Sequence, residues 1–371
     1  MVEFDVVVVG SINTDMSVFT SAFPNPGETV IGSEFVTGFG GKGANQSVAA
    51  KLLGCKVALV AKVGNDGFGG SYIAHLKKTG INCKGVKETS DAGTGVAFIT
   101  VVRESGENRI IVVPGANMQL SLSDINSADR QGLLNSRVVV CQFEVNAAAT
   151  LHALRLAQSN GALTILNPAP PPVPSTERGY FELLPELLAA SDYCCPNETE
   201  ALQMIHRCAS SVTTVEGGGD GVSLLPDEFL TCLDWLAEHG VKQPMITLGS
   251  KGVAILLDSS EVPAGLPVDV TIVQSRKSRK DSTKGVVLLL SAPHVPNVID
   301  TTGAGDSFVG ALAYFVSSHP HLGTLEHVRR ALWVASQSVR KVGTQSSYPN
   351  RDELHPTLFE ASVFQWPSAD K

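Results

Sequence analysis

The feature that most constrains the fold is the regular alternation of short apolar runs with segments of helical periodicity. The first run, FDVVVV at residues 4–9, is continuous and rich in β-branched residues, as a strand buried on both faces requires. Further strands are expected at 57–63, 138–143, 162–167 and 244–249, and helices at 44–53, 68–79, 147–159 and 198–208. Strands that alternate with helices predict an α/β fold, in which helices cover both faces of a central, mostly parallel sheet. The expected architecture is a three-layer sandwich.

Three stretches break this alternation. Residues 12–37 and 93–114 are richer in short strands and turns, and the second has the pattern of a β-hairpin. Together they predict a small antiparallel lid on the main sheet. The polar, basic stretch 274–284 lies within an insertion at approximately 259–293 and is expected to be a solvated surface loop. Because no internal repeat divides the chain, we expect residues 1–371 to form a single domain.

Composition narrows the possible partners. The chain has 371 residues, a formal net charge of −8 and 6% aromatic residues, so we expect no nucleic-acid partner. Acidic Glu3 and Asp5 interrupt the N-terminal run, and no apolar run approaches the roughly 18 residues of a membrane span. We therefore expect no membrane association and a cytoplasmic protein.

The odd number of cysteines, without a C-x-x-C pair, predicts reduced thiols at Cys55, Cys83, Cys141, Cys194, Cys195, Cys208 and Cys232.

The most informative stretch is DTTGAGD at residues 300–306, between an apolar run and a segment of helical spacing. Gly303, Ala304 and Gly305 would leave backbone N–H groups at the start of that helix available to an anion. Asp306 has two interpretations. It could cap the helix, or it could take a proton from a substrate hydroxyl while the N–H groups hold a transferring phosphoryl group. Two glycines around an alanine favour the second interpretation, because a cap needs only one polar residue.

A second glycine-rich stretch has the pattern of a different class of enzyme. Gly38, Gly40 and Gly43 match G-x-G-x-x-G, and Asp66 follows about 20 residues on, which is the pattern of a dinucleotide-dependent oxidoreductase. The expected strand before it is poor, Lys42 lies inside the loop, and Asp66 lies in a turn beyond the next strand. The same loop could bring backbone N–H groups, an ammonium and an amide onto another polar ligand.

Polar residues follow several of the expected strands. Ligands of open α/β sheets bind beyond the carboxyl ends of the strands, so these positions are candidates for binding hydroxyl or phosphate groups. Asn197 and Glu200 also have capping-box spacing, which is a structural alternative for that pair. The candidates are Asn13, Asp15, Glu144, Asn197 and Glu200, together with the tight turn at 247–252.

Seven motifs occur in one order over nearly the whole chain: GSINTD, FPNPGETV, FGGKGANQSVAA, LNPAP, PNETEA, TLGSKG and DTTGAGDSFVGAL. In this order they resemble the ribokinase (PfkB) family of sugar kinases. The resemblance implies a ribokinase-like sandwich whose β-lid often forms a homodimer. It also implies ATP-dependent phosphorylation of the 5-hydroxyl of D-ribose, which yields D-ribose 5-phosphate. Within the family, Lys42 and Asn45 in GGKGAN are similar to ribokinases rather than to adenosine kinases or fructokinases.

The resemblance also implies roles for single residues. Asp306 would be the general base, and Gly303, Ala304 and Gly305 would form the anion hole. The implied ribose ligands are Asn13, Asp15, Gly41, Lys42, Asn45, Glu144 and Asp306. The implied nucleotide ligands are Asn197, Thr247, Gly249, Ser250, Gly252 and Gly305, and Asn197 and Glu200 would organise water around Mg²⁺. The implied ligands of an activating K⁺ ion are Asp300, Thr302, Ser338, Lys341, Gly343 and Ser347.

The chain departs from the family pattern in two places. The connection over 259–293 is longer than usual, and Leu332 stands where relatives often have Asn or His near the adenine. Two alternatives stay open: another sugar or nucleoside kinase of the same fold, and the oxidoreductase. The intact Asp306 argues against a catalytically silent sugar-binding relative.

Overall fold

The computed structural model describes residues 2–171, 179–208, 226–277, 284–362 and 364–366. Its centre is a large sheet with the strand order β13-β14-β12-β11-β10-β9-β8-β1-β4-β5. Neighbours from β11 to β5 are parallel, and β12, β14 and β13 add an antiparallel edge. The strands are β1 (Phe4–Val9), β4 (Val57–Gly64), β5 (Asn82–Thr89), β8 (Ser136–Gln142), β9 (Leu163–Asn167), β10 (Tyr193–Cys194), β11 (Gln243–Thr247), β12 (Val253–Asp258), β13 (Val270–Lys277) and β14 (Lys284–Leu290).

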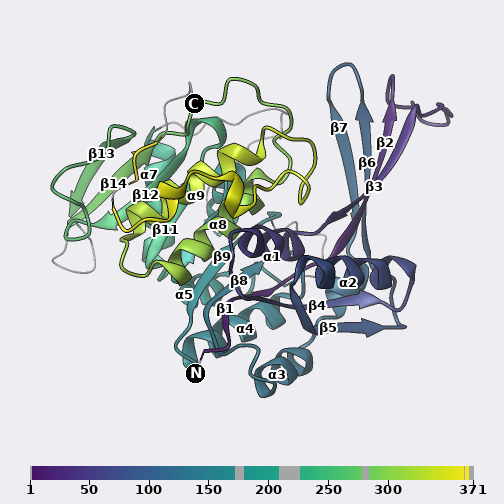
Figure 1. The fold of residues 1–371 in the computed structure, drawn as a ribbon, viewed down its shortest axis with the longest axis horizontal. Coiled ribbons are helices and arrows are strands. Elements are labelled where there is room, and N and C mark those ends of the chain that lie inside the picture. The colour runs from purple at the N-terminus through teal and green to yellow at the C-terminus, as the bar shows by residue number, and fades with distance from the viewer. Residues whose placement is uncertain (1, 172–178, 209–225, 278–283, 363, 367–371) are drawn as a thin grey trace.

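Strand β1 explains why helices cover both faces of this sheet. Val6 and Val8 lie in one apolar core and Val7 and Val9 in another, and all four are fully buried. The first face packs against α1 (Lys42–Leu52), α2 (Gly67–Thr79), α8 (Ala304–Ser318) and α9 (Thr324–Ser338). The opposite face packs against α3 (Leu122–Arg130), α4 (Ala147–Ser159), α5 (Leu184–Ala189), α6 (Glu198–Cys208) and α7 (Pro226–Glu238). These layers form the expected α/β sandwich (Figure 1).

A second sheet stands away from the body as a lid (Figure 1). Its order is β3-β2-β6-β7, and its strands are β2 (Asn13–Thr20), β3 (Glu34–Gly40), β6 (Gly95–Val102) and β7 (Asn108–Val113). The pairs β2–β3 and β6–β7 are antiparallel, as expected, but the central pair β2–β6 is parallel. The expectation of a purely antiparallel lid is therefore wrong. Each predicted segment forms its own antiparallel pair, and the first strands of the two pairs run in the same direction.

The surface loop expected at 274–284 is in part strand, because the insertion at approximately 259–293 adds two strands to the main sheet. Strands β13 and β14 lie within it and pair antiparallel from Val270–Leu290 to Lys277–Lys284, which widens the main sheet. The apolar runs VTIV and VVLLL supply the β-branched and aliphatic residues that a strand favours. Residues 274–277 and 284 are therefore strand, and the rest of the expected basic loop lies outside the described residues.

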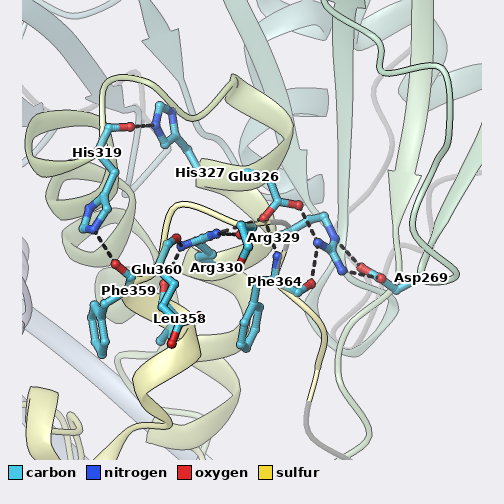
Figure 2. Close-up of polar contacts among 11 residues, drawn as sticks. Asp269, His319, Glu326, His327, Arg329, Arg330, Leu358, Phe359, Glu360 and Phe364 are labelled. Carbon is cyan, nitrogen blue, oxygen red and sulfur yellow. Dashed lines mark hydrogen bonds and ion pairs between the residues drawn. The ribbon is translucent and has the colours of Figure 1, made fainter.

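Two adjacent buried arginines of α9 tie the C-terminal segment to the body (Figure 2). Arg330 donates to three main-chain carbonyls within 358–362 at 2.6 to 2.7 Å. Arg329 binds the Asp269 carboxylate with two nitrogens, at 2.6 and 2.8 Å. Glu326 accepts from both arginines and so closes the network. The charges thereby fix α9 against both the sheet edge and the chain end.

Two further expectations concern the environment of the chain. Within the described residues, no helix is both long and apolar enough to cross a membrane. Six of the seven cysteines are described, and these six are free: Cys55, Cys83, Cys141, Cys194, Cys195 and Cys232. The seventh, Cys208, ends helix α6, and its side chain lies outside the description.

Candidate active site

The candidate residues gather where helix α1 begins against the end of β1. Gly43 approaches the chain after β1 so closely that a Cβ there would lie 2.4 Å from Ser11 N. Glu144, just beyond β8, accepts from Ser11 Oγ at 2.5 Å and from Lys42 N at 3.0 Å. The first helix, the first strand and β8 therefore meet at one carboxylate. The structure begins this helix at Lys42, two residues earlier than expected.

The base of the lid brings Asn13 and Asp15 to the same place. On the neighbouring strand they face Gly40 and Gly38, and a Cβ on Gly40 would lie 2.3 Å from the Asp15 carboxylate. Glycine at that position therefore leaves space for Asp15. Asn117, which sequence reasoning missed, donates to Asn13 Oδ1 at 2.8 Å and so orients the Asn13 amide.

The structure excludes one of the two interpretations of Asp306, that of a helix cap. The N-cap of α8 is Gly303, at φ 76°, and no side chain caps the helix. Asp306 lies buried in the first turn, where its two oxygens accept from Asn45 Nδ2 and Gln46 Nε2, both at 2.9 Å. Its carboxylate thus faces α1 and is not used as a cap. Of the N–H groups in this turn, Ala304 N donates to Thr301 O at 3.2 Å, while Gly305 N has no partner within the helix.

Buried polar groups without partners mark the same helix start. Within the described residues, Ser307 Oγ and Tyr348 OH are buried and have no hydrogen-bond partner. A Cβ on Gly303 would lie 2.7 Å from the Tyr348 hydroxyl, so the left-handed turn also requires glycine for space. Buried unpaired hydroxyls are uncommon and are consistent with a site that a ligand completes.

Acidic groups outnumber the basic ones here, and their pKa values reflect this. Burial first, then the charges of Glu144 and Asp306, raises the pKa of Asp15 to about 7. Burial also raises the pKa of Glu200 to about 7, although Lys42 opposes the shift. Burial alone would lower the pKa of Lys42, but Asp306, Glu144 and Glu200 outweigh it and raise that pKa. The side chains are therefore close enough to form one electrostatic cluster.

The candidate nucleotide residues lie beside this cluster. Asn197 and Glu200 form the reciprocal capping pair expected from their spacing, with N–H to side-chain oxygen distances of 2.8 and 2.9 Å. Asn197 also pairs in a parallel bridge with Thr247 at the end of β11. Beyond it, Gly249–Lys251 form a single exposed turn that ends at Gly252. The structure thus joins the two expected nucleotide segments.

The candidate cation residues are brought together in part. Asp300 accepts from Thr302 N at 2.9 Å and from Gly343 N at 2.8 Å. Burial opposes ionisation of Asp300, but these hydrogen bonds lower its pKa. The side chains of the other three candidates are engaged with groups other than Asp300: Ser338, Lys341 and Ser347.

Sequence reasoning missed three amides that support these groups, the buried Gln46 and Gln142 and the half-buried Gln345. Gln46 donates to Asn167 Oδ1 at 3.0 Å and accepts from Gln142 Nε2 at 2.7 Å. Gln345 donates to Asn45 Oδ1 at 2.9 Å. Gln46 directly follows Asn45 in its motif, and Gln142 is the polar residue that ends an apolar strand. The sequence could therefore have indicated both as candidate site residues. Gln345 lies in a polar turn and has no such signal.

The residues of the dinucleotide pattern are used differently. Gly38 and Gly40 lie within lid strand β3, and Lys42 opens α1. Asp66 caps α2 by accepting from Gly69 N at 2.8 Å, and it also accepts from Thr94. Although β3 leads through Gly41 into α1, β3 belongs to the lid and not to a βαβ unit of the main sheet, so the context that the pattern requires is missing.

Comparison with known proteins identifies the family. The profile described as "pfkB family carbohydrate kinase" matches residues 3–274 and 282–351. The chain belongs to this family. It is therefore an ATP-dependent sugar kinase, a phosphotransferase, and the oxidoreductase alternative is wrong.

Three similar proteins show how far the likeness extends. Ribokinase of Mus musculus is 38% identical over 354 residues, which are 95% of this chain and 94% of that protein. Deoxyribokinase of Salmonella typhi is 32% identical over 360 residues, 95% and 98% of the two chains. The structure of Arabidopsis thaliana ribokinase complexed with ribose and ATP is 26% identical, with a TM-score of 0.71 over 94% and 96% of the chains. The sandwich and the separate lid sheet are thus those of the family.

Proposed function

We propose that this kinase phosphorylates the 5-hydroxyl of D-ribose with ATP and releases D-ribose 5-phosphate. The observation that carries the proposal is the buried Asp306 carboxylate, held by two amide donors at the start of α8. Its charge also acts on Asp15 and Lys42, which stand among the proposed sugar ligands. The 38% identity to a ribokinase supports ribose as the acceptor.

The proposed reaction is a direct displacement at the γ-phosphorus. A bond forms from the ribose 5-oxygen to phosphorus, the bond to the bridging oxygen of ADP breaks, and the hydroxyl proton passes to Asp306. Gly303, Ala304 and Gly305, with the dipole of α8, would stabilise the charge on the transferring group. The proposed sugar ligands are Asn13, Asp15, Gly41, Lys42, Asn45 and Glu144, with Asp306.

The nucleotide and its Mg²⁺ are assigned to the neighbouring segments. Asn197 and Glu200 offer amide and carboxylate oxygens, the ligand type that Mg²⁺ and its bound water prefer. When bound, Mg²⁺ would offset the charge of the phosphates. The proposed nucleotide ligands are Asn197, Thr247, Gly249, Ser250, Gly252 and Gly305. Leu332 is buried in α9, so an apolar contact replaces the polar one at that position.

We further propose K⁺ as an activator, held by the turns around Asp300. The donors are oxygens without thiolates or imidazoles, which suits a hard cation. The lowered pKa of Asp300 keeps its carboxylate ionised at neutral pH. Because Ser338, Lys341 and Ser347 use their side chains elsewhere, they would contribute main-chain carbonyls, alongside Thr302 and Gly343.

We also propose that two copies of the chain form a homodimer through the lid. The proposed compartment is the cytoplasm. The lid exposes large apolar side chains, among them Phe35 at 61%, Phe98 at 49% and Ile111 at 69%. An exposed apolar patch of this kind on a sheet is typical of an interaction surface.

A substrate panel tests the proposed activity. Phosphate transfer from MgATP is measured to ribose, 2-deoxyribose, fructose and adenosine, with Asp306→Asn as the inactive control. We expect the highest kcat/KM on ribose. A clear preference for deoxyribose would assign the chain to the deoxyribokinase group, and turnover of adenosine alone would overturn a sugar substrate.

A further inference from the structure

Three successive residues after α9 contact three parts of the candidate site. Gly343 N donates to Asp300 Oδ2 at 2.8 Å. Thr344 Oγ1 donates to the carbonyl of Phe39, near the end of lid strand β3, at 3.1 Å. Gln345 reaches the first two helices. One short segment therefore touches the proposed cation site, the base of the lid and the residues around Asp306.

The Gln345 amide has a partner for each of its groups. Its Nε2 donates to Asn45 Oδ1 at 2.9 Å and to Tyr72 OH at 2.8 Å, and its Oε1 pairs with His75 Nε2 at 2.9 Å. Tyr72 can only accept here, because its own hydroxyl proton goes to Gly40 O at 2.5 Å. Both amide hydrogens are thereby committed, and the amide has one orientation that satisfies all its neighbours.

The orientation of Gln345 decides that of Asn45. Because Gln345 is the donor, Asn45 turns Oδ1 toward it and Nδ2 toward Asp306, at 2.9 Å. We propose that Gln345 is a positioning residue for phosphoryl transfer, which holds the Asn45 amide in the orientation that donates to Asp306. The inference rests on the proposed role of Asp306 as the base.

The second donor to Asp306 provides an internal comparison. Gln46 donates to Asp306 Oδ1, and its orientation is fixed independently, because Gln142 donates to Gln46 Oε1 at 2.7 Å. A change at Gln345 therefore removes one oriented donor from the base and leaves the other in place. We accordingly expect partial loss of activity rather than complete loss.

Reversing the polarity of the side chain tests the inference most directly. Gln345→Glu keeps the shape but has no N–H, so Asn45 Nδ2 turns to it and Asn45 Oδ1 faces Asp306. We expect kcat/KM to fall about 10- to 100-fold, the range for one lost hydrogen bond to a charged group. The loss should appear in kcat while the KM for MgATP stays unchanged, because Gln345 acts on the residues around Asp306 and not on the nucleotide segments.

A second substitution separates the lost donors from an added charge. Gln345→Met removes both donors and adds no charge, so its effect on kcat reports the lost donors alone. Gln345→Glu also brings a second carboxylate toward Asp306, so its loss should be larger. A clear loss of kcat in a Gln345→Met protein that melts like the wild type supports the inference, and a wild-type kcat in that variant overturns it.

Gln337, near the end of α9, supplies the matched control. Its amide donates to Ser336 Oγ at 3.0 Å and accepts from Arg340 at 3.1 Å, and neither partner contacts Asn45 or Asp306. Gln337→Glu and Gln337→Met should keep the wild-type kcat. Thermal melting checks folding, and if Gln345→Glu does not fold, Gln345→Met decides alone: a wild-type kcat would overturn the inference.

The acceptor in this test is the sugar that the wild type phosphorylates fastest. If the wild type does not phosphorylate ribose, the proposed substrate is wrong, but the Gln345 variants can still be compared with the wild type on the sugar that it does use. Wild-type behaviour of both Gln345 variants, beside an inactive Asp306→Asn, would overturn the positioning role and leave the base in place.

Discussion

The raised pKa of Asp15 makes a quantitative prediction for Asp15→Asn. Burial and the charges of Glu144 and Asp306 raise this pKa from the ordinary 3.8 to about 7. A group whose pKa is higher in the folded than in the unfolded state stabilises the fold at low pH, and this contribution is lost as the pH rises through the folded pKa. The free energy of unfolding of the ligand-free protein should thus fall through Asp15 as the pH rises from about 4, and most of this loss is complete near pH 7. Asparagine cannot ionise and removes that loss.

The size of the effect follows from the two pKa values. With an unfolded pKa near 3.8 and a folded pKa near 7, linkage gives a loss of about 2.5 kcal/mol between pH 5 and pH 8. Unfolding entropies of about 2.1 cal/mol/K per residue give about 0.8 kcal/mol/K for 371 residues. The difference in Tm between Asp15→Asn and wild type should therefore grow by about 3 °C in favour of the variant over this range.

Thermal melts of the ligand-free proteins at pH 5, 6, 7 and 8, at one ionic strength, measure this difference. Asp91→Asn is the control, because Asp91 is an exposed carboxylate of the lid region. Calorimetry with ribose should show that Asp15→Asn binds the sugar more weakly. A variant whose Tm follows that of the wild type across all four pH values would refute the reasoning.

Three further predictions follow from single residues. Asp306→Asn should lower kcat about 10²- to 10⁴-fold, the usual contribution of a general base, with little change in ribose affinity by calorimetry; turnover within a few-fold of wild type would make Asp306 structural. K⁺ should raise the rate above Na⁺ or a bulky organic cation at constant ionic strength, and Asp300→Ala should abolish the response; equal rates in all three salts would contradict the cation site. Arg330→Met removes three carbonyl contacts and an ion pair with Glu326, so urea unfolding should show a loss of about 3–5 kcal/mol; a loss under 1 kcal/mol would refute the role of this network.

The parallel strands and their helices were predictable from the sequence. A parallel strand buried on both faces needs a continuous apolar run, so FDVVVV and VVVCQF could be located directly. Helices 147–159 and 198–208 match the structure at both ends. The motif at 300–306 was also local, because a glycine turn and the helix that follows it are adjacent in the chain.

Features that depend on distant pairing were not predictable in the same way. The parallel contact of β2 with β6 joins two hairpins that the sequence shows only as separate segments. The strands of the insertion look like a polar loop because the sequence between their apolar runs is basic. Gln345 acts on Asn45 across 300 positions, and a glutamine in a polar turn carries no local pattern that would indicate this contact.

The acid cluster itself argues that the site is built for a ligand. Asp306 acts on both Asp15 and Glu200, Glu144 acts on Asp15, and two of these four carboxyls have pKa values raised to about 7. Asp306, Glu144 and Glu200 all act on Lys42. Folding alone would favour apolar residues or neutral amides at these positions, since like charges brought together in a buried site destabilise it. A polyhydroxyl ligand changes this balance, because each hydroxyl can donate a hydrogen bond to a carboxylate and replace the water lost on burial. Sugar binding should therefore stabilise this protein more at pH 8 than at pH 5, because Asp15 and Glu200, whose pKa values are about 7, are ionised at the higher pH.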